Sequence, residues 1–187
     1  VYELPFTTTF RELLMDICGG PPEGRSFKAM LPSGGSGPIV PLTDEVLDTR
    51  MSYEDCSNID TIIGSASLII MDDSVDITWV ASKVTKFFKH ESCGKCTPCR
   101  EGTYWLDKVL DRIMANEASE SDIDLIANVA RNMQGVTLCA LGEFAANPII
   151  HTVRQFPDDF KQHIKQPEAD ANAKGGKRAK KAEAAGD

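Results

Sequence analysis

Long apolar runs are missing from this sequence, and basic residues are scarce in its first part. No stretch approaches the roughly 18 consecutive apolar residues of a transmembrane helix, so we expect no direct membrane insertion. No basic and then apolar segment indicates a secretory signal, and the chain begins at Val1, so we expect a fragment or a processed product. Residues 1–76 hold 4 Lys or Arg against 13 Asp or Glu, which argues against a nucleic-acid partner.

Residues 1–75 predict a small α+β unit that begins with a strand end at residues 1–4 and a helix at residues 9–20. Thr9 and Glu12 fit a capping box, and Gly19 is the expected stop of the helix. The spacing predicts one buried apolar stripe on this helix, made of Phe10, Leu13, Leu14 and Ile17.

The rest of this unit is expected to hold two strands, at residues 26–31 and 67–71, separated by Gly/Pro turns. The glycine-rich run at residues 32–38 could suggest a phosphate-binding loop. It lacks the Lys-Ser/Thr ending and does not lead into a helix, so we expect a turn there.

Residues 76–165 change to helical periodicity and predict four helices. The first runs from Asp76 into a cysteine-rich loop, and the second leaves that loop through Trp105 and Leu106. The third is expected to start on Ser121 and to stop at Gly135. It buries Ile126, Val129, Ala130 and Met133. The fourth is expected to begin near residues 147–148, with Pro148 as its first helical residue.

The predicted fold class is therefore α+β, in three parts. An α+β unit over residues 1–75 precedes an all-α four-helix bundle over residues 76–165. Residues 166–187 contain no aromatic or branched aliphatic residue and predict a disordered tail.

Three of the six cysteines, Cys93, Cys96 and Cys99, recur at a strict spacing of three. This spacing turns successive thiolates inward from one tight loop, as in the loops that hold three corners of an iron-sulfur cubane. Structural zinc usually takes cysteines as separated pairs around one tetrahedral ion, so the pattern favours iron-sulfur over zinc. Disulfides are a weaker interpretation, because the thiols are two residues apart and no secretory signal is seen.

A fourth ligand has three candidates among the remaining cysteines. Cys18 follows Leu14 at helical spacing, so we expect a small buried hydrophobe there. Cys56 lies in the acidic α+β unit. Cys139 lies in the helical part between two glycines that let the backbone approach a cofactor, and we choose it.

The segment ESCGKCTPCREGTYWL, with 39 residues between its Cys99 and the cysteine of TLCALGEFAANPI, resembles the carboxy-terminal third of the NADH-binding flavoprotein subunit of respiratory complex I, NADH-quinone oxidoreductase. The segments VYELPFTTTFRELL and MLPSGGSGPIV share in the resemblance, which covers roughly residues 1–165. It implies a β-grasp domain of the soluble-ligand-binding type that lacks its first strand, followed by the helical iron-sulfur bundle. It places the 4Fe-4S ligands on Cys93, Cys96, Cys99 and Cys139.

The resemblance also implies a function. Members of this family bind FMN and NADH in a Rossmann-like domain to which nothing here corresponds. We therefore expect the cluster to carry single electrons from reduced FMN in a missing domain to clusters of neighbouring subunits. The expected partners are the two-iron-cluster subunit and the large iron-sulfur subunit. The complex is an enzyme, whereas this fragment alone is expected not to oxidise NADH. The expected location is cytoplasmic, peripheral to the inner face of the cell membrane, or on the matrix side in mitochondria.

Three alternatives stay open from the sequence. One is the diaphorase subunit of an NAD-linked hydrogenase or formate dehydrogenase, which shares these motifs. The others are a structural zinc module and a ligand-binding interaction module.

Other polar residues receive weaker interpretations. Basic residues cluster around the cysteine loop, and they either raise the potential of a cluster or form a solvated helix face: Lys83, Lys86, Lys89, His90, Lys95 and Arg100. Arg100 is the strongest candidate because it adjoins Cys99. His151 and His163 are expected at the surface, and no catalytic constellation is evident.

Overall fold

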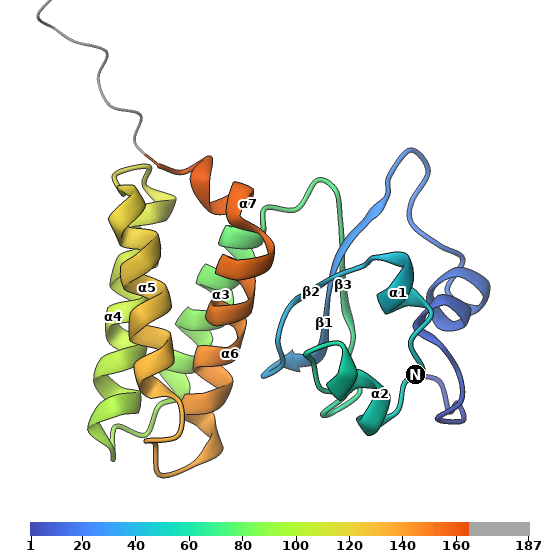
Figure 1. Cartoon of the computed structure of the whole chain (residues 1–187), viewed down its shortest axis with the longest axis horizontal. Coiled ribbons are helices and arrows are strands. Elements are labelled where there is room, and N and C mark those ends of the chain that lie inside the picture. Colours follow the sequence, from blue (N-terminus) through green and yellow to red (C-terminus); the bar gives the residue numbers. More distant parts are fainter. Residues whose placement is uncertain (165–187) are drawn as a thin grey trace, which may run out of the picture.

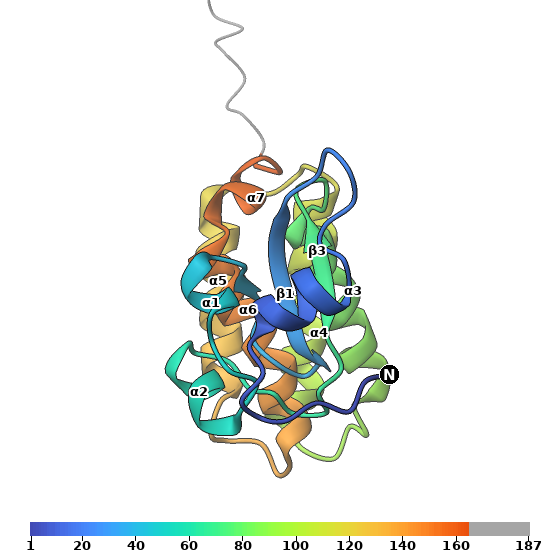
Figure 2. The same ribbon diagram turned by 90° about the vertical axis from the view of Figure 1, so that its right-hand side faces the viewer.

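The structure is a computed structural model that describes residues 1–164. It combines a small antiparallel sheet and its short helices with a group of longer helices, and the two parts pack side by side (Figures 1 and 2). The tail predicted over residues 166–187 lies outside the described residues. Within residues 1–164, no helix is both long and apolar enough to cross a membrane.

The first helix of the chain is wound as a π-helix, η1 (Glu12–Ile17). Its capping box is confirmed, because Glu12 N donates to Thr9 Oγ1 at 3.1 Å and Thr9 N donates to Glu12 Oε2 at 2.8 Å. The strand end predicted at residues 1–4 is wrong, since no strand is assigned there.

The burial predicted along η1 is only partly right. Phe10, Leu13 and Leu14 are buried, but Ile17 and Cys18 are exposed. The reason is the winding: Cys18 N donates to Leu13 O, five residues back. Residues four apart therefore no longer lie on the same face of η1. Leu14 is buried in the core, whereas Cys18 is exposed.

The sheet has three antiparallel strands in the order β2-β1-β3. Strands β1 (Phe27–Gly35) and β3 (Ile69–Asp72) agree with the predictions, and β2 (Val40–Pro41) was not predicted. The glycine-rich run is only partly a turn, because β1 continues to Gly35 before the chain bends and enters β2. Two short helices, α1 (Asp44–Leu47) and α2 (Tyr53–Asn58), begin at Thr43 and Ser52, whose hydroxyls accept backbone N–H groups. The core of this unit gathers around Phe10, Met30 and Val40.

Four longer helices pack against one another: α3 (Ile77–Glu91), α4 (Thr97–Met114), α5 (Glu120–Met133) and α6 (Ala140–Gln155). Each packs against the next, and α3 also packs against α6. Their shared core contains Leu106, Leu110, Ile126 and Ile149, all fully buried. Ile126, Ala130 and Met133 are buried as predicted, and Val129 is partly buried.

Two predicted helix starts are wrong. Helix α5 begins after Ser119, because Ser119 and Asp122 form a capping box two residues before the predicted start at Ser121. Helix α6 begins directly after Cys139 and carries Pro148 in its interior, so proline does not mark its start. The seven residues of α6 that precede Asn147 therefore extend the helix to the cysteine itself.

A final short helix, α7 (Pro157–Lys161), connects the helices to the sheet. Asp159 Oδ2 accepts from Lys28 Nζ on β1 and from Ile77 N at the start of α3, each at 2.7 Å. The surface position expected for His163 is wrong, since its side chain is 15% exposed and lies between Asp76 and Asn116.

Candidate metal centre

The cysteines of the helical part meet at one end of the four helices. The α3–α4 connection carries Cys93 and Cys96, the α5–α6 connection carries Cys139, and both connections lie at the same end (Figures 1 and 2). A cavity of about 170 Å³ lies between them. Its lining includes Cys93, Cys96, Cys99 and Cys139, together with Leu138 and Leu141. The two sequence segments that were predicted to share a cofactor thus line one space.

Two of the four cysteines occupy helix starts. Cys96 is the N-cap of α4 and Cys139 is the N-cap of α6. Cys99 lies in the first turn of α4 and is 6% exposed, whereas Cys93 and Cys139 are exposed. Both helices therefore direct the positive ends of their dipoles at the thiol cavity, which favours negative charge there.

The two thiols at the start of α4 differ in their electrostatics. A hydrogen bond from the backbone of Leu138 is the largest cause that lowers the pKa of Cys96, and the charge of Arg100 lowers it further. Burial raises the pKa of Cys99, although the hydrogen bond with Ser92 acts in the opposite direction. The thiol of Cys96, at the start of α4, is thus more readily ionised than the thiol of Cys99.

The α3–α4 connection is held in shape by its neighbours. Gly94 has φ +73°, a left-handed conformation that glycine adopts at little cost. Arg100 Nη1 donates to Gly94 O at 2.8 Å, and Arg100 Nε pairs with Glu101 at 2.8 Å. Arg100 therefore clamps the connection, and its charge is shared with a carboxylate.

The basic residues near the connection are largely paired with other groups. Lys86 contacts Asp111, Lys89 contacts Asp107, and His90 contacts Glu91. Lys83 lies over the ring of Trp79. These contacts fit a solvated, paired helix surface better than a set of free charges directed at the cysteines.

The α5–α6 connection has its own anchor, which the sequence did not reveal. Thr137 Oγ1 donates to Cys139 O at 3.0 Å, and Glu143 accepts from Gly135 N. Gly142 faces Thr137 so closely that a side chain there would collide with it. Gly142 is one of the two glycines on either side of Cys139 that were expected to let the backbone approach a cofactor, and its neighbour in the structure is Thr137.

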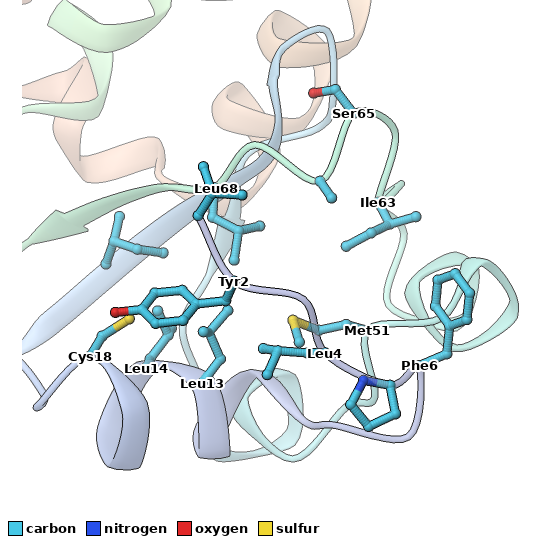
Figure 3. A pocket seen from close by; sticks show the side chains of 14 residues that line it. Tyr2, Leu4, Phe6, Leu13, Leu14, Cys18, Met51, Ile63, Ser65 and Leu68 are labelled. Atoms are coloured by element: carbon cyan, nitrogen blue, oxygen red, sulfur yellow. The ribbon is translucent and has the colours of Figure 1, made fainter.

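The remaining cysteines lie elsewhere. Cys56 is fully buried in the α+β unit, and burial raises the pKa of its thiol to about 11. Cys18 is exposed and lines a larger apolar cavity of about 590 Å³ in the same unit. Figure 3 shows the ring of Tyr2 beside Cys18 and Leu14 in this cavity.

Among residues 1–164, no three His, Cys, Asp or Glu side chains are grouped as a site for a single metal ion.

The helical part is similar to known proteins. Residues 79–163 match the family described as the NADH-ubiquinone oxidoreductase-F iron-sulfur binding region. The F subunit of NADH-quinone oxidoreductase from Mycobacterium bovis is 40% identical over 163 residues, which are 87% of this chain and 36% of that protein. The corresponding F subunit from Rhodobacter capsulatus is 38% identical over 166 residues, which are 88% of this chain and 38% of that protein.

A solved structure shares the arrangement of helices and sheet. It is an NAD+-reducing NiFe-hydrogenase in the H2-reduced state, with a TM-score of 0.76 and 28% identity, and the match covers 90% of this chain and 28% of that one. The chain thus spans less than two fifths of the length of each of these relatives.

Proposed function

We propose that this chain, whose residues 79–163 match the iron-sulfur binding region of the NADH-ubiquinone oxidoreductase-F family, holds a 4Fe-4S cluster on Cys93, Cys96, Cys99 and Cys139. The family predicted from the sequence is confirmed by the match over these residues. The choice of ligands is supported by one observation above all: four cysteines from two separate connections line one cavity.

The donor set fits the chemistry of such a cluster. Four thiolates complete the coordination of four irons, and Leu138 and Leu141 add apolar side chains to the lining of the same cavity. When bound, the cluster supplies one-electron chemistry. The chain itself supplies the frame: Arg100 clamps one connection, Thr137 holds the other, and two helix starts favour the negative charge that accumulates on reduction.

The role in the whole protein follows as part of the proposal. The cluster would take single electrons from FMN reduced by NADH in the remainder of the flavoprotein subunit, and pass them to clusters of the two-iron-cluster subunit and the large iron-sulfur subunit. The complex would lie in the cytoplasm against the inner face of the membrane, or on the matrix side in mitochondria. The finer fold belongs to this proposal too: a β-grasp unit over residues 1–75 and an iron-sulfur four-helix bundle over residues 76–165.

The experiment is anaerobic reconstitution of the 187-residue chain with iron and sulfide, followed by metal analysis and paramagnetic resonance. We expect four irons and four sulfides per chain, and a one-electron signal after dithionite. NADH, with or without added FMN, should leave the spectrum unchanged, because hydride transfer needs a two-electron acceptor such as a flavin. Stoichiometric zinc without iron would contradict the proposal and favour the structural zinc module.

A second candidate is the equivalent part of a diaphorase subunit. The similarity to the NAD+-reducing hydrogenase favours it, since the match covers 90% of this chain. The subunits that co-purify with the full-length protein distinguish the two candidates. Quinone-reducing partners support the first, whereas a hydrogenase or a formate dehydrogenase large subunit supports the second.

The ligand-binding alternative depends on the 590 Å³ cavity, whose volume falls within the usual range of small-molecule sites. Its lining is apolar apart from a few groups such as Tyr2, Cys18 and Ser65. A rise in melting temperature with a medium-chain fatty acid, lost in Leu14→Gln, would support this candidate.

A further inference from the structure

One hydroxyl group lies against a cysteine sulfur in the candidate centre. Ser92 Oγ is 3.3 Å from Cys99 Sγ, within the range of a hydrogen bond to sulfur. A sulfur bonded to iron carries no proton, so in the loaded protein only the serine hydroxyl can donate. Among the four cysteines, Cys99 is the most buried, and a hydrogen bond in such surroundings is stronger than one in water.

The surroundings of Ser92 fix the direction of its hydroxyl. Ser92 ends helix α3, where its backbone N–H donates to Phe88 O at 2.9 Å. Gly94 N donates to Ser92 Oγ at 3.4 Å, so the oxygen is engaged as an acceptor. The hydroxyl proton is then free for Cys99 Sγ. The left-handed conformation of Gly94, held by Arg100, keeps this donor in place.

We infer that Ser92 is a positioning residue that raises the reduction potential of the cluster by donating a hydrogen bond to the sulfur of Cys99. This inference rests on the proposed function. Reduction by one electron adds negative charge to the cluster and its sulfurs, so a donor to sulfur stabilises the reduced state more than the oxidised state. Ser92 also lines a second cavity, together with Lys89, Arg100 and Tyr104.

The test compares the midpoint potential of the reconstituted 187-residue chain with that of Ser92→Ala, by dithionite titration monitored with paramagnetic resonance. We expect the ratio of reduced to oxidised cluster at a fixed potential to fall about tenfold in Ser92→Ala, which is a lowering of about 59 mV for a one-electron couple. Ser92→Thr keeps a hydroxyl and should restore the potential. The control is Thr97→Val, because Thr97 is an exposed hydroxyl residue at the first position of α4, next to Cys96.

Iron content separates the possible outcomes. An unmodified chain without iron contradicts the proposed function itself. A fully loaded Ser92→Ala with an unchanged potential contradicts the role of Ser92 alone. Loss of iron in Ser92→Ala, with full iron and the wild-type potential in Ser92→Thr, supports the hydroxyl. Loss of iron in both variants overturns the inference, because the shape of the side chain rather than its donor would then be what matters.

Discussion

Gly142 has no side chain at a position where Thr137 leaves no room for one. A Cβ atom at residue 142 would lie 2.7 Å from Thr137 Oγ1, the same oxygen that donates to Cys139 O. Substitution of Gly142 should therefore displace the anchor of the fourth cysteine.

We expect Gly142→Ala to lower the free energy of unfolding by about 1–3 kcal/mol, the usual cost of overpacking, and to reduce the iron bound per chain. Chemical denaturation and iron analysis measure the two effects. The control is Gly35→Ala, because a Cβ there meets Phe88 at an ordinary 3.8 Å and should leave the iron content unchanged. Full iron in Gly142→Ala would show that Thr137 does not position Cys139.

At the scale of single elements, the start of α5 tests how capping decides a helix boundary. Ser119 pairs with Asp122, whereas Ser121 lies inside the helix. Ser119→Ala should destabilise the protein by about 0.5–2 kcal/mol through loss of the cap. Ser121 is exposed, and its hydroxyl lies 2.8 Å from that of Ser119. Ser121→Ala removes this one exposed contact and leaves the Ser119–Asp122 pair in place, so it should change stability by less than about 0.5 kcal/mol. Urea denaturation of both variants is sufficient, and the reverse order would restore the start predicted from the sequence.

Asp122 in the same cap gives a pH dependence. Backbone and side-chain hydrogen bonds from Ser119, together with Arg112, hold the pKa of Asp122 below its usual value of 3.8. Its contribution to stability is therefore complete above about pH 4 and is lost as the pH falls through the lowered folded-state pKa.

The stability difference between the unmodified chain and Asp122→Asn should accordingly be largest near pH 7 and shrink toward pH 3. Urea midpoints at the two pH values measure it. A difference that stays constant or grows on acidification would contradict this account of the cap.

Sequence patterns predicted some elements well and others poorly, for physical reasons. The Thr9–Glu12 capping box and the period of α3 to α5 depend on local contacts, and they were found. The exposure of Cys18 was missed because π-winding changes which residues share a face. The length of α6 was missed because proline is common at the first position of a helix, whereas Pro148 lies inside this one. Packing of α6 against α3 and α5 stabilises the helix on both sides of the proline.

In the candidate site too, the local spacing of cysteines was informative, whereas side-chain contacts that depend on packing were not predicted. The Cys93, Cys96 and Cys99 spacing is local, so the sequence alone revealed it. Cys139 had to be chosen across 39 residues, and its place beside the others depends on the packing of α6 against α3 and α5. The contacts of Ser92 and Thr137 depend on side-chain geometry, for which spacing carries no signal.

At the scale of the whole molecule, Asp159 joins the sheet to the helices. Its carboxylate accepts from Lys28 of β1 and from Ile77 N of α3, and its side chain is 15% exposed. Asp159→Ala leaves both donors without this acceptor, so we expect a loss of about 1–3 kcal/mol in the free energy of unfolding.

The neighbouring Asp158 is a matched control, since its side chain is 94% exposed and its nearest cation is Lys161 at 3.9 Å. Asp158→Ala should change stability by less than about 0.5 kcal/mol. Equal effects of the two substitutions, in guanidinium denaturation, would mean that Asp159 does not connect the two parts.

The central claim is that four particular thiols hold the cluster, and iron analysis of six single Cys→Ala variants tests it most directly. Each chain is reconstituted anaerobically, and iron, sulfide and the paramagnetic signal after dithionite are measured. Replacement of Cys93, Cys96, Cys99 or Cys139 should abolish or degrade the four-iron cluster, because each thiolate completes one iron. Replacement of Cys18 or Cys56, which lie outside the thiol cavity, should leave four irons. A Cys139→Ala chain that keeps a complete four-iron cluster would contradict the account.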